Sequence, residues 1–228
     1  MTYDALVLDH DGVLVDIINP ETLRARFRRE TVDEFETLGV EPTDEVVETL
    51  YLSVAHEDVQ SLAQQYDVDP ARLWRCREDA IERILREAAK QGEKDTYDDV
   101  RLLTAVDLPL GIVSNNQRRI VEFVTEYHGI RSYFDTIRAR EPRLDSLRRK
   151  KPSPTLLREA LADLCVENPL YVGDTESDVL AAQRAGVDVA FLRRRHNGEC
   201  ELETEPSIEV TGLADVIELL DTPPRSDV

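Results

Sequence analysis

The sequence is poor in the features that would assign it to several specialised classes. Cysteine occurs three times, and an odd number of widely spaced thiols at Cys76, Cys165 and Cys200 favours neither a disulfide framework nor a zinc site. No apolar run approaches the ~18 residues that a membrane-spanning helix requires, and the N-terminus does not resemble a signal peptide. We therefore expect a soluble, cytoplasmic protein with reduced thiols and no membrane partner.

Acidic residues outnumber basic ones by 47 to 28, and lysine is scarce. The formal net charge is −19, which argues against nucleic-acid backbones and anionic membranes as partners. Only four of the 28 basic residues are lysines, namely Lys90, Lys94, Lys150 and Lys151, and the other 24 are arginines. This composition favours one of two explanations: adaptation to a salt-rich, halophilic cytoplasm, or the ordinary acidic bias of a GC-rich genome.

The first explanation makes a prediction about salt. At ~1 M ionic strength the screening length falls to about 3 Å, so the repulsion between acidic groups costs little free energy. A halophilic protein should therefore melt at a higher temperature in molar KCl than in dilute buffer. Thermal melts at the two KCl concentrations measure this difference, and equal stability in both would contradict the adaptation.

The start of the chain carries the most informative stretch. Ala5 to Leu8 is a short apolar run, typical of a strand that is buried on both faces, and Asp9 and Asp11 follow its C-terminal end. Gly12 permits a tight turn that directs both carboxylates into one crevice. In an open α/β sheet this edge is where ligands bind. The two carboxylates repel each other there unless a cation or a shared proton intervenes.

Residues 17–94 show helical patterns only. Asn19-Pro20 has the N-cap and first-position residues of a helix, and Asp69-Pro70 opens another helix that ends near Gly92. An all-helical insertion directly after the acidic turn predicts a lid on hinges near Asp16 and Gly92. The 228 residues then divide into a core of residues 1–16 and 95–221, a helical cap domain of residues 17–94 and a flexible tail of residues 222–228.

From Asp95 onward, helical and strand patterns alternate. Apolar runs predict strands at residues 110–113, 170–172 and 189–192, with weaker signals at 134–137 and 208–210, whereas residues 138–149 have the composition of a charged loop. Regular β/α alternation predicts a doubly wound parallel sheet with right-handed crossovers, which is an α/β, Rossmann-like core.

Polar residues follow two of these later strands and the charged loop between them. Ser114 and Asn115 end one strand, Lys151 precedes a Pro-x-Pro helix start, and Asp174 and Asp178 lie at the end of another strand. Taken singly, these residues have ordinary explanations as an N-cap, a surface charge or first-turn acids favoured by a helix dipole. Their order along the chain and their placement at one sheet edge favour a common site instead.

This ordered set resembles the haloacid dehalogenase-like (HAD) superfamily. Its four motifs are Asp-x-Asp, a Ser or Thr at a strand end, a Lys, and Gly-Asp-x-x-x-Asp or a close variant. A helical insertion after the first motif resembles the C1-capped branch, which includes phosphoglycolate phosphatase-like enzymes. One departure is Ile17, which stands where many such phosphatases have Ser or Thr. Asp11 argues against dehalogenase activity, since the dehalogenases of the family lack an acid there.

The chemistry of the residues agrees with this resemblance. A carboxylate with a reference pKa of ~3.9 is ionised at neutral pH, so Asp9 is a candidate nucleophile toward phosphorus without an activating base. Mg²⁺ held by Asp9, the backbone carbonyl of Asp11 and Asp174 would offset its repulsion from a phosphate dianion. Asp178 would be a further ligand or an anchor of the site.

The remaining residues have roles in binding and proton transfer. Lys151 offers a compact positive charge to the transferring phosphoryl group, and Ser114 and Asn115 offer hydrogen bonds to its oxygens. Asp11 would protonate the leaving alcohol and then accept a proton from the attacking water.

We therefore expect a Mg²⁺-dependent phosphatase that hydrolyses a small phosphorylated metabolite through an aspartyl-phosphate, as a monomer or homodimer. Two alternatives stay open. A sugar phosphomutase would return the phosphoryl group to its substrate, although the helical insertion has no lysine before Lys90. A non-catalytic binding or regulatory protein is the other, because fold alone does not determine function.

Overall fold

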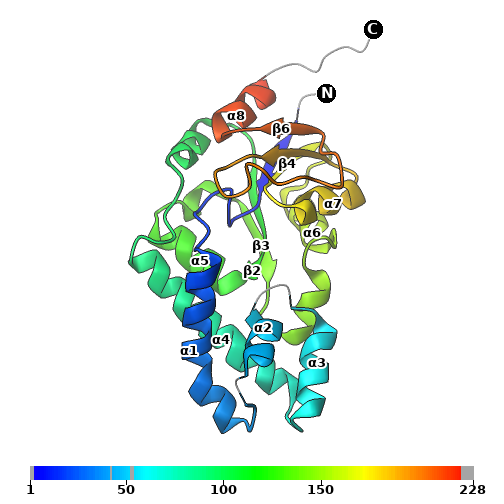
Figure 1. Ribbon diagram of the computed structural model, residues 1–228. Helices are drawn as coiled ribbons and strands as arrows, with labels where there is room; N and C mark the ends of the chain where they lie inside the picture. Colours follow the sequence, from blue (N-terminus) through cyan, green and yellow to red (C-terminus); the bar gives the residue numbers. More distant parts are fainter. Residues whose placement is uncertain (1–2, 42, 52–53, 222–228) are drawn as a thin grey trace.

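The computed structural model describes residues 3–41, 43–51 and 54–221 (Figure 1). The tail predicted at residues 222–228 lies outside the described residues. Across the part of the chain that is described, no helix combines the length and the apolar character that a membrane crossing needs.

A six-stranded sheet forms the centre of one half of the molecule. Its strands lie in the order β3-β2-β1-β4-β5-β6, and every neighbouring pair is parallel. The strands are β1 (Ala5–Leu8), β2 (Leu110–Gln117), β3 (Thr136–Arg140), β4 (Pro169–Gly173), β5 (Asp188–Leu192) and β6 (Ile208–Val210). The predicted doubly wound α/β fold is therefore confirmed, with β1 in the interior of the sheet.

Helices cover both faces of this sheet. Because side chains alternate between the faces of a strand, Leu6 and Leu8 belong to one apolar cluster and Val7 to the other, and all three are fully buried. One face packs against α5 (Arg118–Tyr127), α8 (Leu213–Asp221) and the 3₁₀ helix η1 (Asp98–Ala105). The opposite face packs against α6 (Thr155–Leu164) and α7 (Glu176–Ala185).

Four helices between β1 and η1 form the other half of the molecule, below the sheet in Figure 1. We call them the four-helix unit: α1 (Pro20–Thr37), α2 (Asp44–Tyr51), α3 (His56–Gln65) and α4 (Pro70–Lys90). The predicted caps are confirmed. The Asn19 side chain accepts hydrogen bonds from the amides of Glu21 and Thr22, and Asp69 accepts one from the amide of Arg72 at 2.7 Å. α4 packs against α1 and α3, and also against α5 beside the sheet.

The structure corrects the prediction of a charged loop at residues 138–149. β3 continues through Arg138 to Arg140, and the 3₁₀ helix η3 occupies Leu144–Arg149. Both arginines are accommodated in an edge strand because each pairs with an acidic residue. Arg138 Nε donates to Asp163 Oδ2 at 2.6 Å, and Arg140 Nη2 lies 3.2 Å from Glu78 Oε1. The charge of this stretch is thus neutralised by partners distant in the sequence.

Candidate active site

The turn after β1 brings the first motif to the carboxyl edge of the sheet. The amide of Asp9 donates to the Val172 carbonyl at 2.8 Å, so the chain is still paired to β4 when it turns. Gly12 has a φ of +81°, and a Cβ atom at this position would overlap the Asp174 carboxylate. Only glycine allows the turn to pack so closely against the end of β4.

Three carboxylates meet at this edge. One oxygen from each of Asp9, Asp174 and Asp178 lies within 4.8 Å of the others, and all three residues are buried. Among the described residues, Asp9 Oδ1 and Asp174 Oδ1 accept no hydrogen bond of good geometry. Burial raises the pKa of Asp9 well above its usual range, and it raises the pKa of Asp174 as well. Three buried carboxylates this close together, with Asp174 Oδ1 lacking a hydrogen-bond partner among the described residues, fit a hard divalent cation.

Asp178 differs from the other two acids because its oxygens are already engaged. Oδ2 accepts hydrogen bonds from the Thr175 amide at 3.0 Å and the Thr175 hydroxyl at 2.6 Å, which caps α7. Oδ1 accepts from the Tyr171 hydroxyl at 2.8 Å and lies 2.6 Å from Lys151 Nζ. Burial acts against ionisation, but Lys151 and these donors outweigh it and lower the pKa of Asp178. The Asp178 side chain is therefore held on both oxygens, and its lowered pKa favours the ionised form.

Lys151 lies between the acids of the first and last motifs. Its Nζ is 2.8 Å from Asp9 Oδ1 and 3.0 Å from the Tyr171 hydroxyl, and the residue is only 2 % exposed. Burial alone would lower its pKa, yet Asp178 and Asp9 raise it above the usual value for lysine. The site thus holds a positive charge beside the Asp9 carboxylate.

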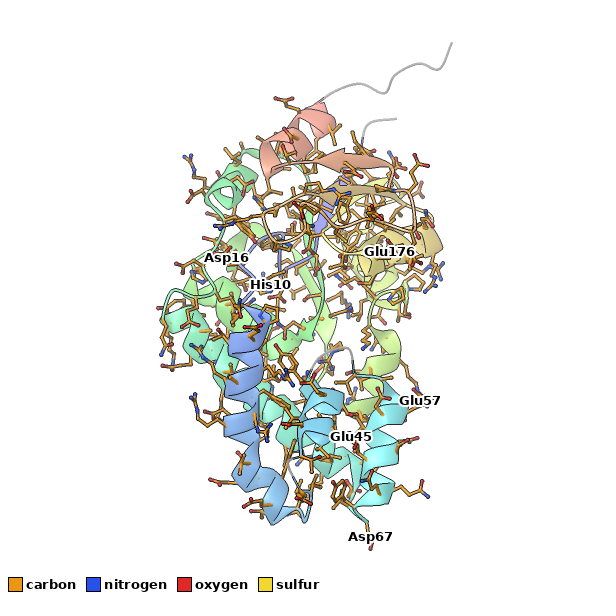
Figure 2. The ribbon with its side chains drawn as sticks, viewed as in Figure 1. His10, Asp16, Glu45, Glu57, Asp67 and Glu176 are labelled. Carbon is orange, nitrogen blue, oxygen red and sulfur yellow. The ribbon has the colours of Figure 1, made fainter. Side chains whose placement is uncertain are left out.

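Asp11 lies in a second, separate cluster. Its Oδ1 forms an ion pair with Lys94, and its Oδ2 accepts a hydrogen bond from Asn116 Nδ2 at 3.0 Å. The buried His10 ring lies 3.4 Å from the same carboxylate. Burial would raise the pKa of Asp11, but Lys94 and His10 outweigh it and hold this pKa well below the usual range. Figure 2 shows His10 at the level where the sheet meets α1, with Asp16 close by.

Lys94 is a site residue that the motifs do not reveal. It belongs to the segment that joins α4 to η1, and it is 2 % exposed. Its contact with Asp11 spans 83 positions of sequence, and no local pattern around it indicates a site. Its one sequence signal is rarity, since it is one of four lysines in the chain.

The end of β2 positions the backbone of Lys151. Asn115 Oδ1 accepts from the Lys151 amide at 2.6 Å, and Asn115 Nδ2 donates to the Lys151 carbonyl at 3.1 Å. Ser114 is buried, and its hydroxyl accepts from the Asn116 amide at 3.1 Å. The side chain of Asn115 thus holds the backbone of Lys151 on both sides and uses one of its two N–H donors to do so. Its predicted role as donor to a phosphate oxygen stays a prediction.

The loop after β5 also reaches the site, and the sequence motifs do not include it. His196 Nε2 lies 2.7 Å from Asp174 Oδ2, and Asn197 Nδ2 donates to the Asp174 carbonyl at 2.8 Å. These contacts fix both the side chain and the backbone of Asp174. The loop has no periodicity or motif from which this role is predictable.

A chamber of about 500 Å³ lies between the four-helix unit and the edge of the sheet. Asp11, Asn115 and Lys151 line it on the sheet side. Trp74, Ile81 and Leu85 of α4 line it on the helical side, together with other apolar residues of the four-helix unit and its first linker. The chamber therefore connects the catalytic edge with a wall made by the insertion.

A buried ionic cluster joins α4 to the sheet next to this chamber. Glu78 is fully buried, lies 2.6 Å from Arg77 Nη1 and 3.2 Å from Arg140 Nη2, and its carbonyl accepts from Gln117 Nε2 at 2.8 Å. Both guanidinium groups lie over the Trp74 ring, at 5.0 and 5.5 Å from its centroid. We refer to Arg77, Glu78 and Arg140 as the seam cluster.

These features define a Rossmann-like α/β protein in which carboxylates and a lysine gather at the carboxyl edge of a parallel sheet, facing an inserted helical unit. Residues 6–192 match the family model described as haloacid dehalogenase-like hydrolase, and the chain belongs to this family. The family resemblance indicated by the four motifs is thereby confirmed.

Individual relatives span almost the whole chain. The chain is similar to pyrophosphatase PpaX of Anoxybacillus flavithermus, with 26% identity over 242 residues that cover 96% of this chain and 98% of the relative. PpaX of Bacillus cereus strain G9842 is 24% identical and covers 99% of this chain and 100% of its own length.

Solved structures share the fold at lower identity. CbbY of Rhodobacter sphaeroides, in complex with phosphate, aligns with a TM-score of 0.68 at 21% identity over 97% of this chain and 100% of its own. A Lactobacillus plantarum protein described as a phosphoglycolate phosphatase aligns at 0.66, with 21% identity over 96% and 100%. YfnB of Bacillus subtilis, bound to magnesium, aligns at 0.60, with 16% identity over 97% and 100%.

Proposed function

We propose that this hydrolase is a Mg²⁺-dependent phosphatase that cleaves a small organic phosphomonoester through an aspartyl-phosphate on Asp9. One observation carries the proposal above all others. A buried carboxylate, Asp9, lies 2.8 Å from a buried ammonium, Lys151, and within a metal-sized cluster with Asp174 and Asp178. This arrangement combines a nucleophile, a fixed charge for a phosphoryl group and ligands for a cation.

The donor set supports Mg²⁺ as the cation. Asp9 and Asp174 would hold it through their carboxylate oxygens, with the backbone carbonyl of Asp11 as a third donor and Asp178 as a further ligand or an anchor of the site. When bound, the ion supplies positive charge that offsets repulsion between Asp9 and an anionic substrate. The magnesium bound by YfnB, which has the same fold, agrees with this choice.

The chemistry proceeds in two transfers on Asp9. A carboxylate oxygen of Asp9 forms a bond to phosphorus as the ester P–O bond breaks, and the departing alcohol oxygen takes a proton from Asp11. Water then attacks phosphorus, loses a proton to Asp11, and releases phosphate with regeneration of the Asp9 carboxylate. Lys151 stabilises the charge on the transferring group in both transfers.

Asp11 has to gain a proton before it acts as an acid. Lys94 keeps its carboxylate ionised in the free protein. An anionic substrate beside Asp11 opposes the effect of Lys94 and raises the pKa of the acid, so proton uptake accompanies substrate binding. The four-helix unit, which we propose is a cap, excludes water from the chamber during this step.

One second candidate has a specific observation in its favour. The similarity to PpaX, a pyrophosphatase, makes inorganic pyrophosphate an alternative substrate for the same residues. The attack by Asp9 and the role of Lys151 would be unchanged, with phosphate in place of an alcohol as the leaving group.

The proposed function is tested by phosphate release from a panel of substrates. The panel contains phosphoglycolate, sugar phosphates, nucleotides and inorganic pyrophosphate, in dilute buffer and in molar KCl. We expect release in Mg²⁺ that falls to background in EDTA and returns when Mg²⁺ is added in excess, because the acid cluster needs its cation. Release that persists in EDTA would refute the metal requirement, and silence both across this panel and with simple alkyl phosphates would refute the phosphatase. Isomerised sugar phosphate without free phosphate would indicate a phosphomutase.

A further inference from the structure

The chamber has an apolar wall on the side away from the acids. Trp74, Ile81 and Leu85 present it from α4, and their exposed fractions are 1, 5 and 6 %. The rest of the wall comprises Ile17, Ile18, Leu23, Tyr51, Val54 and Leu147. A leaving group that enters this space therefore meets hydrocarbon on most sides.

The cations around the chamber are largely neutralised within the protein. Arg77 and Arg140 share the Glu78 carboxylate, Lys94 pairs with Asp11, and Lys151 lies between acids of the catalytic edge. Lys150 is the exception: its ammonium donates to the Val54 carbonyl at 2.6 Å and makes no ion pair within the described ranges. The seam cluster therefore keeps one positive charge in excess, since two guanidinium groups share one carboxylate, and Lys150 adds a second. The wall that Trp74, Ile81 and Leu85 form carries no charge.

We propose that the substrate of this site is a phosphomonoester whose leaving group has an apolar body. The inference rests on the proposed function, since the phosphate is assigned to the Asp9 edge. A chamber of about 500 Å³ matches the size of sites for small organic ligands. Inorganic pyrophosphate would leave the apolar wall without contacts, and a sugar would place hydroxyl groups against that wall.

A series of alkyl phosphates isolates the apolar contribution. Ethyl, butyl and hexyl phosphate have alcohols of nearly equal leaving ability, so differences in kcat/KM report contacts with the chamber. We expect kcat/KM in Mg²⁺ to rise roughly two- to fourfold for each added methylene. The kcat/KM of hexyl phosphate should also be higher than that of inorganic pyrophosphate. It should likewise be higher than that of a hexyl phosphate whose far end carries a carboxylate.

Two variants of α4 supply a matched comparison. Ile81 lines the chamber and Ile84 does not, although the two side chains are on the same helix and are 5 and 4 % exposed. Ile81→Ala should lower the hexyl-to-ethyl ratio of kcat/KM by roughly three- to tenfold. Ile84→Ala loses as many buried carbon atoms, and it should keep the wild-type ratio.

The outcomes separate this inference from the proposed function. Equal kcat/KM for ethyl and hexyl phosphate, or a preference for pyrophosphate or the carboxylate-ended ester, would refute the proposed apolar leaving group. The proposed phosphatase activity would be unaffected by that result. If no ester is hydrolysed, calorimetric binding of the alkyl phosphates to the Asp9→Asn protein decides. Tighter binding of hexyl than ethyl phosphate would then support the apolar chamber, and equal or absent binding would refute it.

Discussion

The Asp9→Asn variant is expected to release phosphate at least ~10⁴ times more slowly than the wild-type protein, because an amide oxygen does not replace the carboxylate as a nucleophile. The fold should persist. Burial beside Asp174 and Asp178 raises the pKa of Asp9, so the ionised carboxylate opposes folding of the metal-free protein at neutral pH. In EDTA the variant should therefore melt at a higher temperature than the wild-type protein.

The sign of this effect predicts a dependence on pH. A carboxyl group whose pKa is raised in the folded state stabilises the folded protein at low pH, where it is protonated. This stabilisation is lost as the pH rises through the folded-state pKa. The difference in melting temperature between variant and wild type should therefore shrink as the pH falls. Asp33→Asn, on the exposed side of α1, is the matched control and should change neither turnover nor stability. Wild-type turnover by Asp9→Asn would exclude the aspartyl-phosphate.

The Lys151→Met variant is expected to lose both activity and stability. Removing the ammonium leaves the carboxylates of Asp9, Asp174 and Asp178 in one buried cluster without a cation. Breaking a buried ion pair from one side costs about 3–5 kcal/mol, so the variant should unfold at a much lower denaturant concentration in EDTA. Its phosphate release should fall by roughly 10³-fold, since a charge on the transferring group is lost.

Magnesium and the neighbouring lysine provide the controls for this result. Added Mg²⁺ should recover part of the lost stability of Lys151→Met, because the cation replaces positive charge among the same acids. Lys150→Met removes a lysine that only donates to the Val54 carbonyl, and it should cost about 1 kcal/mol or less in EDTA. Equal destabilisation by the two substitutions would contradict the assigned role of Lys151.

The sheet and its acidic edge are predictable from sequence because their signals are local. Each buried strand is a short apolar run, and the acids follow it within a few residues, as Asp9 follows Leu8 and Asp174 follows Gly173. Parallel topology then brings the strand ends together, which places Lys151 and Asp178 at the same edge without any contact being known in advance.

The missed residues act through contacts between distant parts of the chain. Lys94 contacts Asp11 from a linker. Arg140 belongs to a stretch whose charged composition is typical of a loop, although the residue lies in β3. Asn115 shows a different limit: its position at a strand end is predictable, but the attachment of its amide to Lys151 depends on side-chain geometry. Sequence patterns specify which edge a residue reaches, whereas its partner there is set by packing.

The seam cluster has a consequence for how such chains can be recombined. Glu78 and its partner Arg77 come from the inserted helices and Arg140 from the sheet, and all three are buried, so the sheet carries a charge whose acidic partner belongs to the inserted helices. Exchanging residues 20–90 for the helices of a relative without an acid at this point would leave Arg140 buried and unpaired. The insertion is consequently not an interchangeable module. Its transfer to or from this protein requires the residue at the end of β3, here Arg140, to be transferred with it.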